Sequence, residues 1–557
     1  MLLGIDVGGT HTDAVIIDRG GVVATAKVET DHTNLIASLD AVLKKILRSK
    51  SGRLPISKIN LSTTLTTNAI VEKQLEEVGV LAVSGPGLAP DYFNHDLGEH
   101  FHLIEGSIDH RGSLRLALNE VAAREAAADC QRNRLKVFAV VSKFSPRNPD
   151  IEQALAELVS AQSDFTTIGH RISGRLNFPR RLATAYYNAA VWRRYNLFAD
   201  AIAQSIKKHK LDAPINILKA DGGTIDFENS RKNPIQTILS GPAASVMGII
   251  ALSSITKDAI ILDIGGTTTD IAIFADGAPL LEKEGVSFGG RATSVRAIGT
   301  HSIGIGGDST ITISPEGKLM VGPQRQGPPL ALNGPQPTLI DACNVKGLCD
   351  LGDPDRSFAG LKKLAEKNSL TVVELADKVL DLALTTIRAE AGKLLETINQ
   401  RPVYTVEEVV HGKKINPQRL YVMGGPAAIL APLLGRIFDL ETEIPNNFAV
   451  ANAIGAALTK TTMEIELFAD TGKKTMFIPN LDIKRKVSSS YSLSDAQQDG
   501  VNELVKYLRE NGHPEVTDQD VSVVEAEAFN MVDDYAVGSK TIRVSCQIRP
   551  GIEEEIK

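Results

Sequence analysis

The chain contains one short motif twice, and this repeat constrains its fold more than any other feature. Residues 4–18 read GIDVGGTHTDAVIID, and residues 262–274 read LDIGGTTTDIAIF. In each copy an apolar run ends in Asp-x-Gly-Gly-Thr and a second apolar run follows, which predicts a tight β-hairpin. Six pairs of positions are identical at one constant spacing: Asp6/Asp263, Gly8/Gly265, Gly9/Gly266, Thr10/Thr267, Thr12/Thr269 and Asp13/Asp270.

Glycine-rich turns of this kind suit phosphate binding. Glycine lacks a Cβ and permits positive φ, so backbone N–H groups can close on a phosphate at these turns. Asp6 and Asp263 stand before the glycines, and we expect them to hold Mg²⁺ through water. Asp13 and Asp270 are further catalytic candidates. The candidate phosphate-binding residues are Gly8, Gly9, Thr10, Thr12, Gly265, Gly266, Thr267 and Thr269.

Either motif alone is also explained as an ordinary turn, because Asp-Gly and Gly-Gly are common turn formers. The duplication favours binding, because two equivalent hairpins that face each other make a clamp for a polyphosphate. The pair therefore predicts a site for a polyphosphate with Mg²⁺.

The paired hairpins resemble those of the acetate kinase, sugar kinase, Hsp70 and actin superfamily, and further segments narrow the resemblance. Over roughly residues 1–460 the chain resembles the hydantoinase A and oxoprolinase family. The segments that carry this resemblance are, in order, GIDVGGTHTDAVI, TTLTTNAIVE, FSPRNPDIEQ, LNFPRRLATAYYNAAV, PIQTILSGPAASVMGI, LDIGGTTTDIAI and VANAIGAAL.

The resemblance implies an α/β fold with two actin-like (ribonuclease H-like) lobes and a nucleotide cleft between them. We expect an N-terminal lobe over 1–175, a second lobe over 176–470 and a small C-terminal α+β appendage over 471–557. A length of 557 residues agrees with several domains, because single cores stop growing at about 250–300 residues. Helices rich in small residues at 240–252 and 451–460 resemble the pair about which superfamily lobes close, with Gly241 and Gly455 at the hinge.

The expected elements of the first lobe are three strands, a helix at 34–48, a strand at 58–61, a helix at 68–75 and a strand at 79–83. This order matches a superfamily half-domain. A long helix is predicted over 179–208, with arginines exposed on one face. They are Arg180, Arg181, Arg193 and Arg194.

The superfamily also suggests roles for two later turns. A general base lies near ADGGTID in its kinases, which makes Asp221 a candidate, although an Asp-Gly turn explains this residue equally well. RLYVMGGPAAIL corresponds to the adenosine-binding turn. Gly424 and Gly425 would let the backbone lie flat against the purine, and Pro426 would stand at the first helical position.

One stretch departs from the family pattern. The family usually has Asp-Ile-His-Thr-x-Gly-Ala-Gly-Gly-Gly-Ser where this chain reads GTHSIGIGGDS from Gly299 to Ser309. His301 is kept and is a candidate metal ligand, with a purely structural role as the alternative. Gly299 replaces the acidic residue and Asp308 replaces a glycine, which puts the metal or substrate role of that acid in doubt.

The resemblance implies a cytoplasmic enzyme that opens a hydantoin or 5-oxoproline ring with ATP, acting on a small cyclic amide or carboxylate. Such family members usually need a B-type partner subunit, and a homo-oligomer remains open. A small-molecule kinase and a non-enzymatic ATP-driven switch are the alternatives.

The net charge of −7 gives no basic surface for binding nucleic acid. The longest apolar run, 246–252, is far below the ~20 residues of a membrane span. We also expect no secretory signal, because no charged segment followed by an apolar run stands before Gly4.

Overall fold

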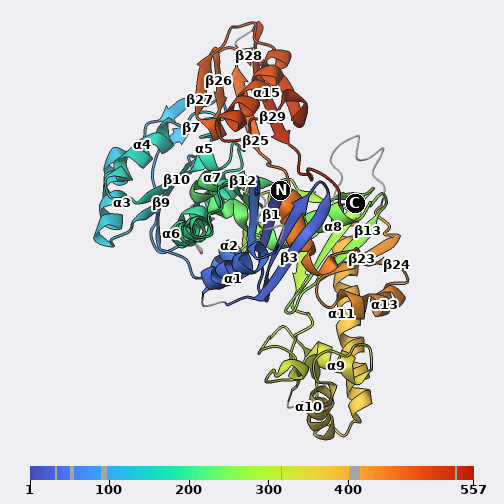
Figure 1. Cartoon of the computed structure of the whole chain (residues 1–557). Coiled ribbons are helices and arrows are strands. Elements are labelled where there is room, and N and C mark those ends of the chain that lie inside the picture. The colour runs from blue at the N-terminus through green and yellow to red at the C-terminus, as the bar shows by residue number, and fades with distance from the viewer. Residues whose placement is uncertain are drawn as a thin grey trace.

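The computed structural model describes residues 1–31, 34–49, 55–88, 97–314, 316–400, 414–533 and 536–556. Figure 1 shows a central body of sheets and helices, with a layer of strands and one long helix at one end and a helical extension at the other. No helix within the described ranges is both long and apolar enough to cross a membrane.

The N-terminal sheet is built around the first hairpin. Its strand order is β12-β11-β4-β1-β2-β3, with β1 antiparallel to β2 and parallel to β4. Helix α1 (Leu35–Leu47) packs on it. The strands are β1 (Leu2–Val7), β2 (His11–Asp18), β3 (Gly21–Glu29), β4 (Lys58–Thr63), β11 (Ile215–Leu218) and β12 (Thr224–Asp226).

The expected strand at 79–83 forms, as β5 (Val78–Val83), but it belongs to a different sheet. The neighbour of β4 on the side away from β1 is instead β11, which also runs parallel to β4 and comes more than a hundred residues later. Residues 215–226 thus join the N-terminal sheet, beyond the expected boundary at 175. Local patterning predicts strands but not their pairing, so the sequence placed a strand at 79–83 in the first lobe without showing which sheet it joins.

The second large sheet repeats this arrangement around the second hairpin. Its strand order is β15-β14-β13-β23-β24, and β20 also pairs with β14. Strand β13 is antiparallel to β14 and parallel to β23. The strands are β13 (Ala259–Ile264), β14 (Thr269–Ala275), β15 (Ala278–Pro279), β20 (Thr300–Ile303), β23 (Arg419–Met423) and β24 (Glu441–Glu443). Both expected hairpins are therefore confirmed.

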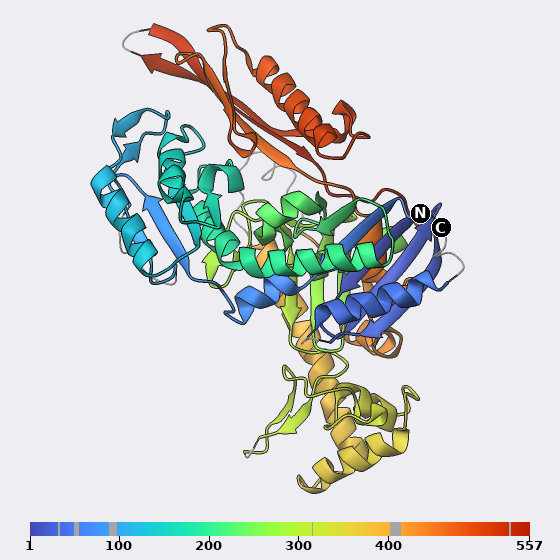
Figure 2. The same cartoon turned by 60° about the vertical axis from the view of Figure 1, so that its left-hand side comes forward.

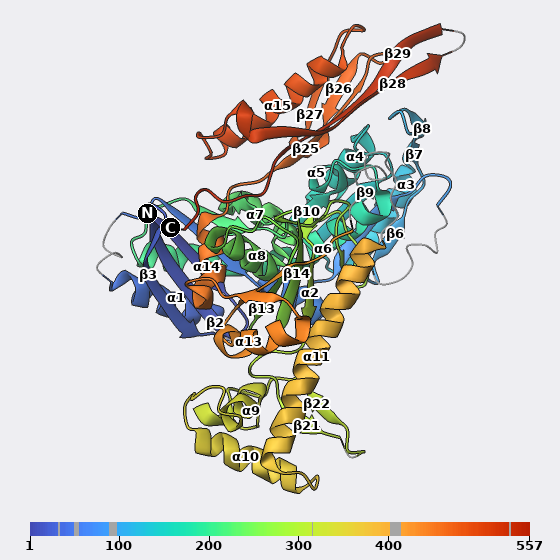
Figure 3. The same cartoon turned by 90° about the vertical axis from the view of Figure 1, so that its right-hand side faces the viewer.

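Two helices, α8 (Ser240–Leu252) and α14 (Ala451–Leu458), lie between these two sheets (Figure 3). They pack backbone to backbone. A Cβ built on Gly455 would lie 2.2 Å from the Ala244 carbonyl oxygen, and one on Gly248 would lie 2.3 Å from the Ala451 carbonyl oxygen. The small residues that the sequence shows in both helices thus allow this close approach.

A four-stranded sheet flanks the N-terminal sheet, in the order β10-β9-β5-β6. The 31-residue helix α6 (Phe178–Lys208) packs against both sheets and runs across the body in Figure 2. Arg181 on this helix was expected to be exposed but is fully buried. Its guanidinium donates to the carbonyls of Arg175 and Ser142, both at 2.6 Å. The other strands of this sheet are β6 (Phe101–Leu103), β9 (Val137–Ser142) and β10 (Phe165–Ile168). The helices that pack against it are α3 (Glu120–Arg132), α4 (Asp150–Ser160) and α5 (Gly169–Ile172).

The C-terminal layer is a five-stranded sheet in the order β27-β26-β25-β29-β28, with α15 (Leu493–Glu510) on one face. Its first strand, β25 (Glu464–Asp470), precedes the expected boundary at 471. The division into three domains stays a prediction. The other strands are β26 (Thr475–Ile478), β27 (Ile483–Lys486), β28 (Val521–Asp533) and β29 (Ala536–Ile548).

The extension at the opposite end is helical. It consists of α9 (Leu339–Val345), α10 (Pro354–Glu366) and the lower part of α11 (Val372–Asn399). Helix α11 is long and amphipathic, and its apolar face packs against the second large sheet.

Candidate functional site

The two hairpin turns close in the same way and their tips meet. The Gly8 N–H donates to the His11 carbonyl at 3.1 Å, and the Gly265 N–H donates to the Thr268 carbonyl at 2.9 Å. A Cβ on Gly266 would lie 2.9 Å from Thr10 Oγ1 of the first hairpin. None of the four turn glycines has positive φ, so the expectation of left-handed backbone was wrong. At Gly266 the absence of a Cβ is what allows the two hairpin tips to approach each other.

The predicted threonine donors divide into two classes. Thr12 Oγ1 contacts Thr30 Oγ1 at 3.0 Å, and Thr269 Oγ1 donates to the Ile305 carbonyl at 2.6 Å. Both side chains are fully buried and brace their turns. Thr10 and Thr267 stay partly exposed at the tips, where hydroxyl donors can reach a ligand.

Asp6 and Asp263 come from different sheets and lie close enough to influence each other. Both are buried, with 4% and 8% of their surface exposed. Burial, followed by the Asp13 charge, raises the pKa of Asp6 to about 7, and the Asp263 charge contributes. Burial also raises the pKa of Asp263, although that carboxylate accepts hydrogen bonds from Ser245 Oγ at 2.5 Å and Asn452 Nδ2 at 3.2 Å.

The second pair of aspartates stands beside the first in register. Asp13 lies opposite Asp6, and Asp270 lies opposite Asp263. Burial raises the pKa of Asp13 although Lys27 Nζ binds it at 2.8 Å. Burial and the Asp263 charge raise the pKa of Asp270 to about 7. Four carboxylates thus gather where the two sheets face each other.

The donor set fits a hydrated Mg²⁺. The buried oxygens Asp6 Oδ1 and Asp13 Oδ1 have no hydrogen-bond partner among the described groups. Buried polar atoms are normally paired, and the water shell that Mg²⁺ keeps when carboxylates bind it would supply donors for both. Asp6 and Asp263 are the residues that would hold the ion.

The Gly-Gly-Pro turn lies directly against the second hairpin. Gly424 has φ 90°, and a Cβ there would lie 2.2 Å from the Ile264 carbonyl oxygen and 2.6 Å from Asp263 Oδ1. Gly425 faces open space, with no atom within 4 Å of a built Cβ. Pro426 was expected at the first helical position but is the N-cap of α13 (Ala427–Phe438), so the helix begins one residue later than expected. Helix ends commonly differ by that much.

The loop after β20 also reaches the second hairpin. The Gly307 N–H donates to the Gly265 carbonyl at 2.9 Å, and the Asp308 N–H donates to the Gly266 carbonyl at 2.7 Å. Asp308, which departs from the family pattern, forms an ion pair with Arg325 at 3.0 Å. This residue thus stands at the hairpin tip.

His301 does not join this site. It lies opposite Ile271 on β14, whereas Ser302 lies opposite Asp270. Side chains alternate between the two faces of a sheet, so His301 points away from the aspartates, toward α11. There its Nε2 atom is 3.3 Å from Glu390 Oε2. Within the described ranges, no cluster of three or more His, Cys, Asp or Glu side chains is arranged to bind a metal.

Asp221 does not join the hairpins either. Its carboxylate accepts from the Gly223 N–H at 3.0 Å and Thr462 Oγ1 at 3.1 Å, and pairs with Lys219 Nζ at 3.1 Å. Burial opposes its ionisation, but the charges of Lys219 and Arg296 outweigh burial and lower its pKa. A carboxylate held ionised in this way is a poor general base. The turn-forming alternative describes Asp221 better.

Three residues of the site were missed from the sequence. Ser245 and Asn452 lie on the two crossing helices and hold Asp263, while Lys27 on β3 holds Asp13. Ser245 and Asn452 belong to segments that the sequence assigned to the hinge, SGPAAS and ANAIG. A polar residue within an otherwise small and apolar helix was the available signal.

The raised pKa of Asp6 predicts a pH-dependent stability. Between its ordinary value of 3.8 and about 7, the folded protein retains a proton that the unfolded chain has released, so the free energy of unfolding falls as the pH rises. Asp6→Asn removes this loss. Measured by urea unfolding without nucleotide or metal, the variant should gain about 1 kcal/mol or more relative to wild type between pH 4 and pH 8.

The exposed Asp381 on α11 provides the matched control. Asp381→Asn removes the same charge from a solvated position and should follow the wild-type pH profile. A profile of Asp6→Asn that also runs parallel to wild type would contradict the burial of an ionisable group at this position.

Two family models match this chain. A model described as the hydantoinase/oxoprolinase N-terminal region matches residues 2–163, and the hydantoinase/oxoprolinase model matches residues 181–465. Together they span both hairpins and the crossing helices.

Relatives with known names or structures agree with these two matches. Caprolactamase subunit alpha from Pseudomonas jessenii is 28% identical over 464 residues, which cover 76% of this chain and 65% of that protein. The chain therefore spans about two thirds of that relative's length. The nucleotide-free structure of acetone carboxylase has a TM-score of 0.71 at 17% identity, covering 100% of this chain and 88% of that chain. The structure of ATP-dependent caprolactamase from Pseudomonas jessenii has a TM-score of 0.68 at 19% identity, covering 98% and 87%. The mixed α/β fold is thus shared with both.

Proposed function

Because the chain belongs to the hydantoinase/oxoprolinase family, we propose that it binds ATP with Mg²⁺ between its two hairpins and uses the ATP to activate a small cyclic amide. We also infer that the two large sheets form actin-like lobes that close on the nucleotide. The meeting of the hairpin tips beside buried Asp6 and Asp263 is the observation that carries this proposal.

The site offers what a polyphosphate needs. Thr10 and Thr267 present hydroxyl donors at the tips. The N–H groups of Gly9 and Gly266 would add backbone donors, because those of Gly8 and Gly265 donate within the hairpins. Mg²⁺ would supply charge neutralisation. Gly425, which faces open space beside the second hairpin, leaves room for a flat purine. Positioning and electrostatic stabilisation of this kind dominate catalysis of phosphoryl transfer.

Amides of the hydantoin or 5-oxoproline type are poor electrophiles. Transfer of the terminal phosphoryl group of ATP to the carbonyl oxygen would make the amide carbon open to attack by water. The tetrahedral carbon that forms would then break its ring C–N bond, with a proton passing to the leaving amine, and a second water would hydrolyse the resulting acyl phosphate to carboxylate and phosphate. The names of the caprolactamase relatives support a cyclic amide substrate and ATP. The acetone carboxylase neighbour shows that the same fold is also found in a carboxylating enzyme.

A partner subunit belongs to this proposal, because the caprolactamase relative is named as an alpha subunit. We propose that a B-type subunit completes the reaction. We also propose that the protein acts in the cytoplasm, where its four free cysteines would remain reduced. ATP turnover should be assayed across a panel of cyclic amides, with and without that partner. A phosphorylated product released intact would identify a kinase, and turnover that no small molecule stimulates would identify a switch.

Nucleotide binding predicts a stabilised protein. Addition of millimolar ATP with Mg²⁺ should raise the melting temperature, because a ligand that binds only the folded state adds about 2.7 kcal/mol at a concentration of 100 Kd. Chelation of Mg²⁺ should reduce the shift. Differential scanning fluorimetry measures both. A folded sample that shows no shift at millimolar ATP would argue against the site.

A further inference from the structure

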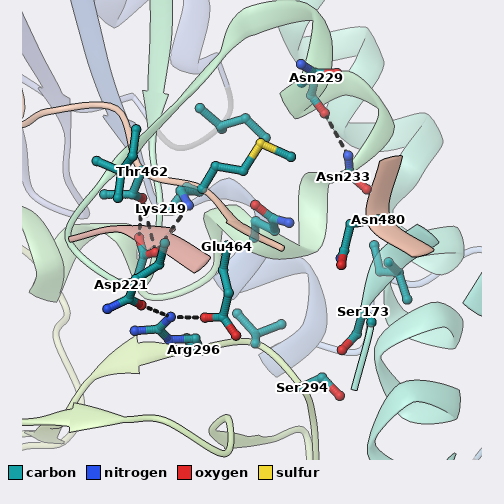
Figure 4. A pocket seen from close by; sticks show the side chains of 18 of the residues that line it. Ser173, Lys219, Asp221, Asn229, Asn233, Ser294, Arg296, Thr462, Glu464 and Asn480 are labelled. Carbon is teal, nitrogen blue, oxygen red and sulfur yellow. Dashed lines mark hydrogen bonds and ion pairs between the residues drawn. The ribbon is translucent and has the colours of Figure 1, made fainter. Parts of the chain in front are cut away.

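A second site of a different character lies between the C-terminal sheet and the body (Figure 4). The pocket has an empty volume of about 1270 Å³, open solvent at its mouth included. Its walls come from the end of α5, the turn after β11, the loop at 294–296, and β25, β29 and α15 of the C-terminal layer. The described lining includes no residue of either hairpin.

The charges that line this pocket balance. Its cations are Arg171, Arg175, Lys219 and Arg296. Its anions are Asp221, Asp226, Glu464 and Glu466. A nucleotide carries several negative charges and would need an excess of cations, which this lining does not offer. A ligand without net charge leaves the balance undisturbed, whereas a buried net charge is costly.

The cations are held in place by the opposite wall. Glu464 on β25 binds Arg175 at 2.9 Å and also pairs with Arg296, and Asp482 binds Arg171 at 2.7 Å. Each of these pairs joins the body to the C-terminal layer. The docked C-terminal layer thus fixes the guanidinium groups and forms one wall of the pocket.

Three polar atoms of the lining residues have no hydrogen-bond partner among the described groups. They are Ser294 Oγ, Arg296 Nε and His513 Nε2. His513 is 6% exposed, and its other ring nitrogen is 3.4 Å from Thr461 Oγ1. A guanidinium nitrogen can only donate, and a hydroxyl donates readily. Buried polar groups left in this state call for an explanation, and a ligand that accepts hydrogen bonds provides one.

We propose that this pocket binds a small molecule without net charge, either a neutral amide or a zwitterion, through its carbonyl or carboxylate oxygen. The site is separate from the hairpins and requires no nucleotide. The pocket also gives the C-terminal layer a function, because Glu464, Asn480 and His513 of that layer are part of the site.

A series of six-carbon probes that differ mainly in charge tests the proposal. Isothermal titration calorimetry of the full chain without ATP would compare ε-caprolactam and 6-aminohexanoate with hexanoate and hexylammonium. The first two should bind at least about tenfold more tightly than the singly charged pair, because one mismatched buried charge costs more than 1.4 kcal/mol. Equal or tighter binding of hexanoate or hexylammonium would overturn the proposal, as would failure of all four to bind.

Variants locate the binding. Arg296→Gln leaves the lining with one excess negative charge, so the preference should shift toward hexylammonium. Ser294→Ala keeps every charge and should weaken ε-caprolactam binding several-fold by removing one donor. Arg147→Gln is the matched control, because Arg147 also joins the body to the C-terminal layer, stacked 4.3 Å from the Phe468 ring, but lies outside this pocket. A shift of preference toward hexylammonium in Arg147→Gln equal to that in Arg296→Gln would overturn the assignment to the pocket.

The same samples separate this inference from the proposed function. Asp263→Asn should bind the probes as wild type does, since Asp263 lies at the hairpins. Probe binding that depends on Asp263 would overturn the proposal of a separate site. If ATP shifts the melting temperature and no probe binds, the pocket inference alone fails; if the probes bind and ATP does not, the proposed function alone fails.

Discussion

Asp6→Asn and Asp263→Asn should each lower ATP turnover by a factor of about 100 or more. Each carboxylate is buried where the two sheets meet, and in the proposed function each holds Mg²⁺ beside the transferred phosphoryl group. Loss of one preorganised charge-stabilising group typically costs a factor of about 10²–10³ in turnover. Phosphate release at saturating ATP and Mg²⁺ measures this effect, and nucleotide affinity should fall less.

Two features of the structure refine this expectation. Asp263 is held by Ser245 and Asn452, so Ser245→Ala should lower turnover less than Asp263→Asn while acting through the same carboxylate. Asp381→Asn, on an exposed position of α11, serves as the control and should turn over ATP normally. Near-normal turnover in both Asp6→Asn and Asp263→Asn would reduce these residues to turn formers.

Gly455→Val should destabilise the protein by about 3 kcal/mol or more, which is at the upper end for overpacked positions. The sequence placed Gly455 at the hinge, and the structure shows what surrounds it. In the structure a Cβ at Gly455 would meet the Ala244 carbonyl oxygen at 2.2 Å and the Gly248 nitrogen at 2.4 Å. Backbone atoms cannot rotate aside as side chains can, so α8 and α14 would have to separate. Urea unfolding of wild type and variant measures the loss.

Gly392→Ala is the control for this substitution. Gly392 lies within α11, and no atom lies within 4 Å of a Cβ built there. Alanine should leave stability unchanged or raise it by up to about 1 kcal/mol, because glycine is a poor helix former. A Gly455→Val protein as stable as wild type would show that the helix crossing is looser than the structure describes.

The sequence by itself determined the two hairpins, because their signal is local. Each consists of an apolar strand, a Gly-Gly turn and a second apolar strand, and the duplication brought Asp6 and Asp263 forward as a pair. The repeat also brought forward Asp13 and Asp270 as a matching pair. Antiparallel pairing within each hairpin places Asp13 opposite Asp6 and Asp270 opposite Asp263. The seven family segments fixed the family for the same reason: each is a contiguous run of residues.

Only the tertiary structure decided which segments meet. The choice of β11 rather than β5 as the neighbour of β4 depends on strand pairing across a long insertion, which periodicity does not encode. The same holds for His301, which sheet alternation turns away from the aspartates, and for Asp221, which Thr462 and Lys219 hold in a different pocket. Helices α8 and α14 bring Ser245 and Asn452 to one carboxylate from positions about two hundred residues apart. A hydrogen bond or ion pair between such residues depends on packing, and no local pattern in the chain records it.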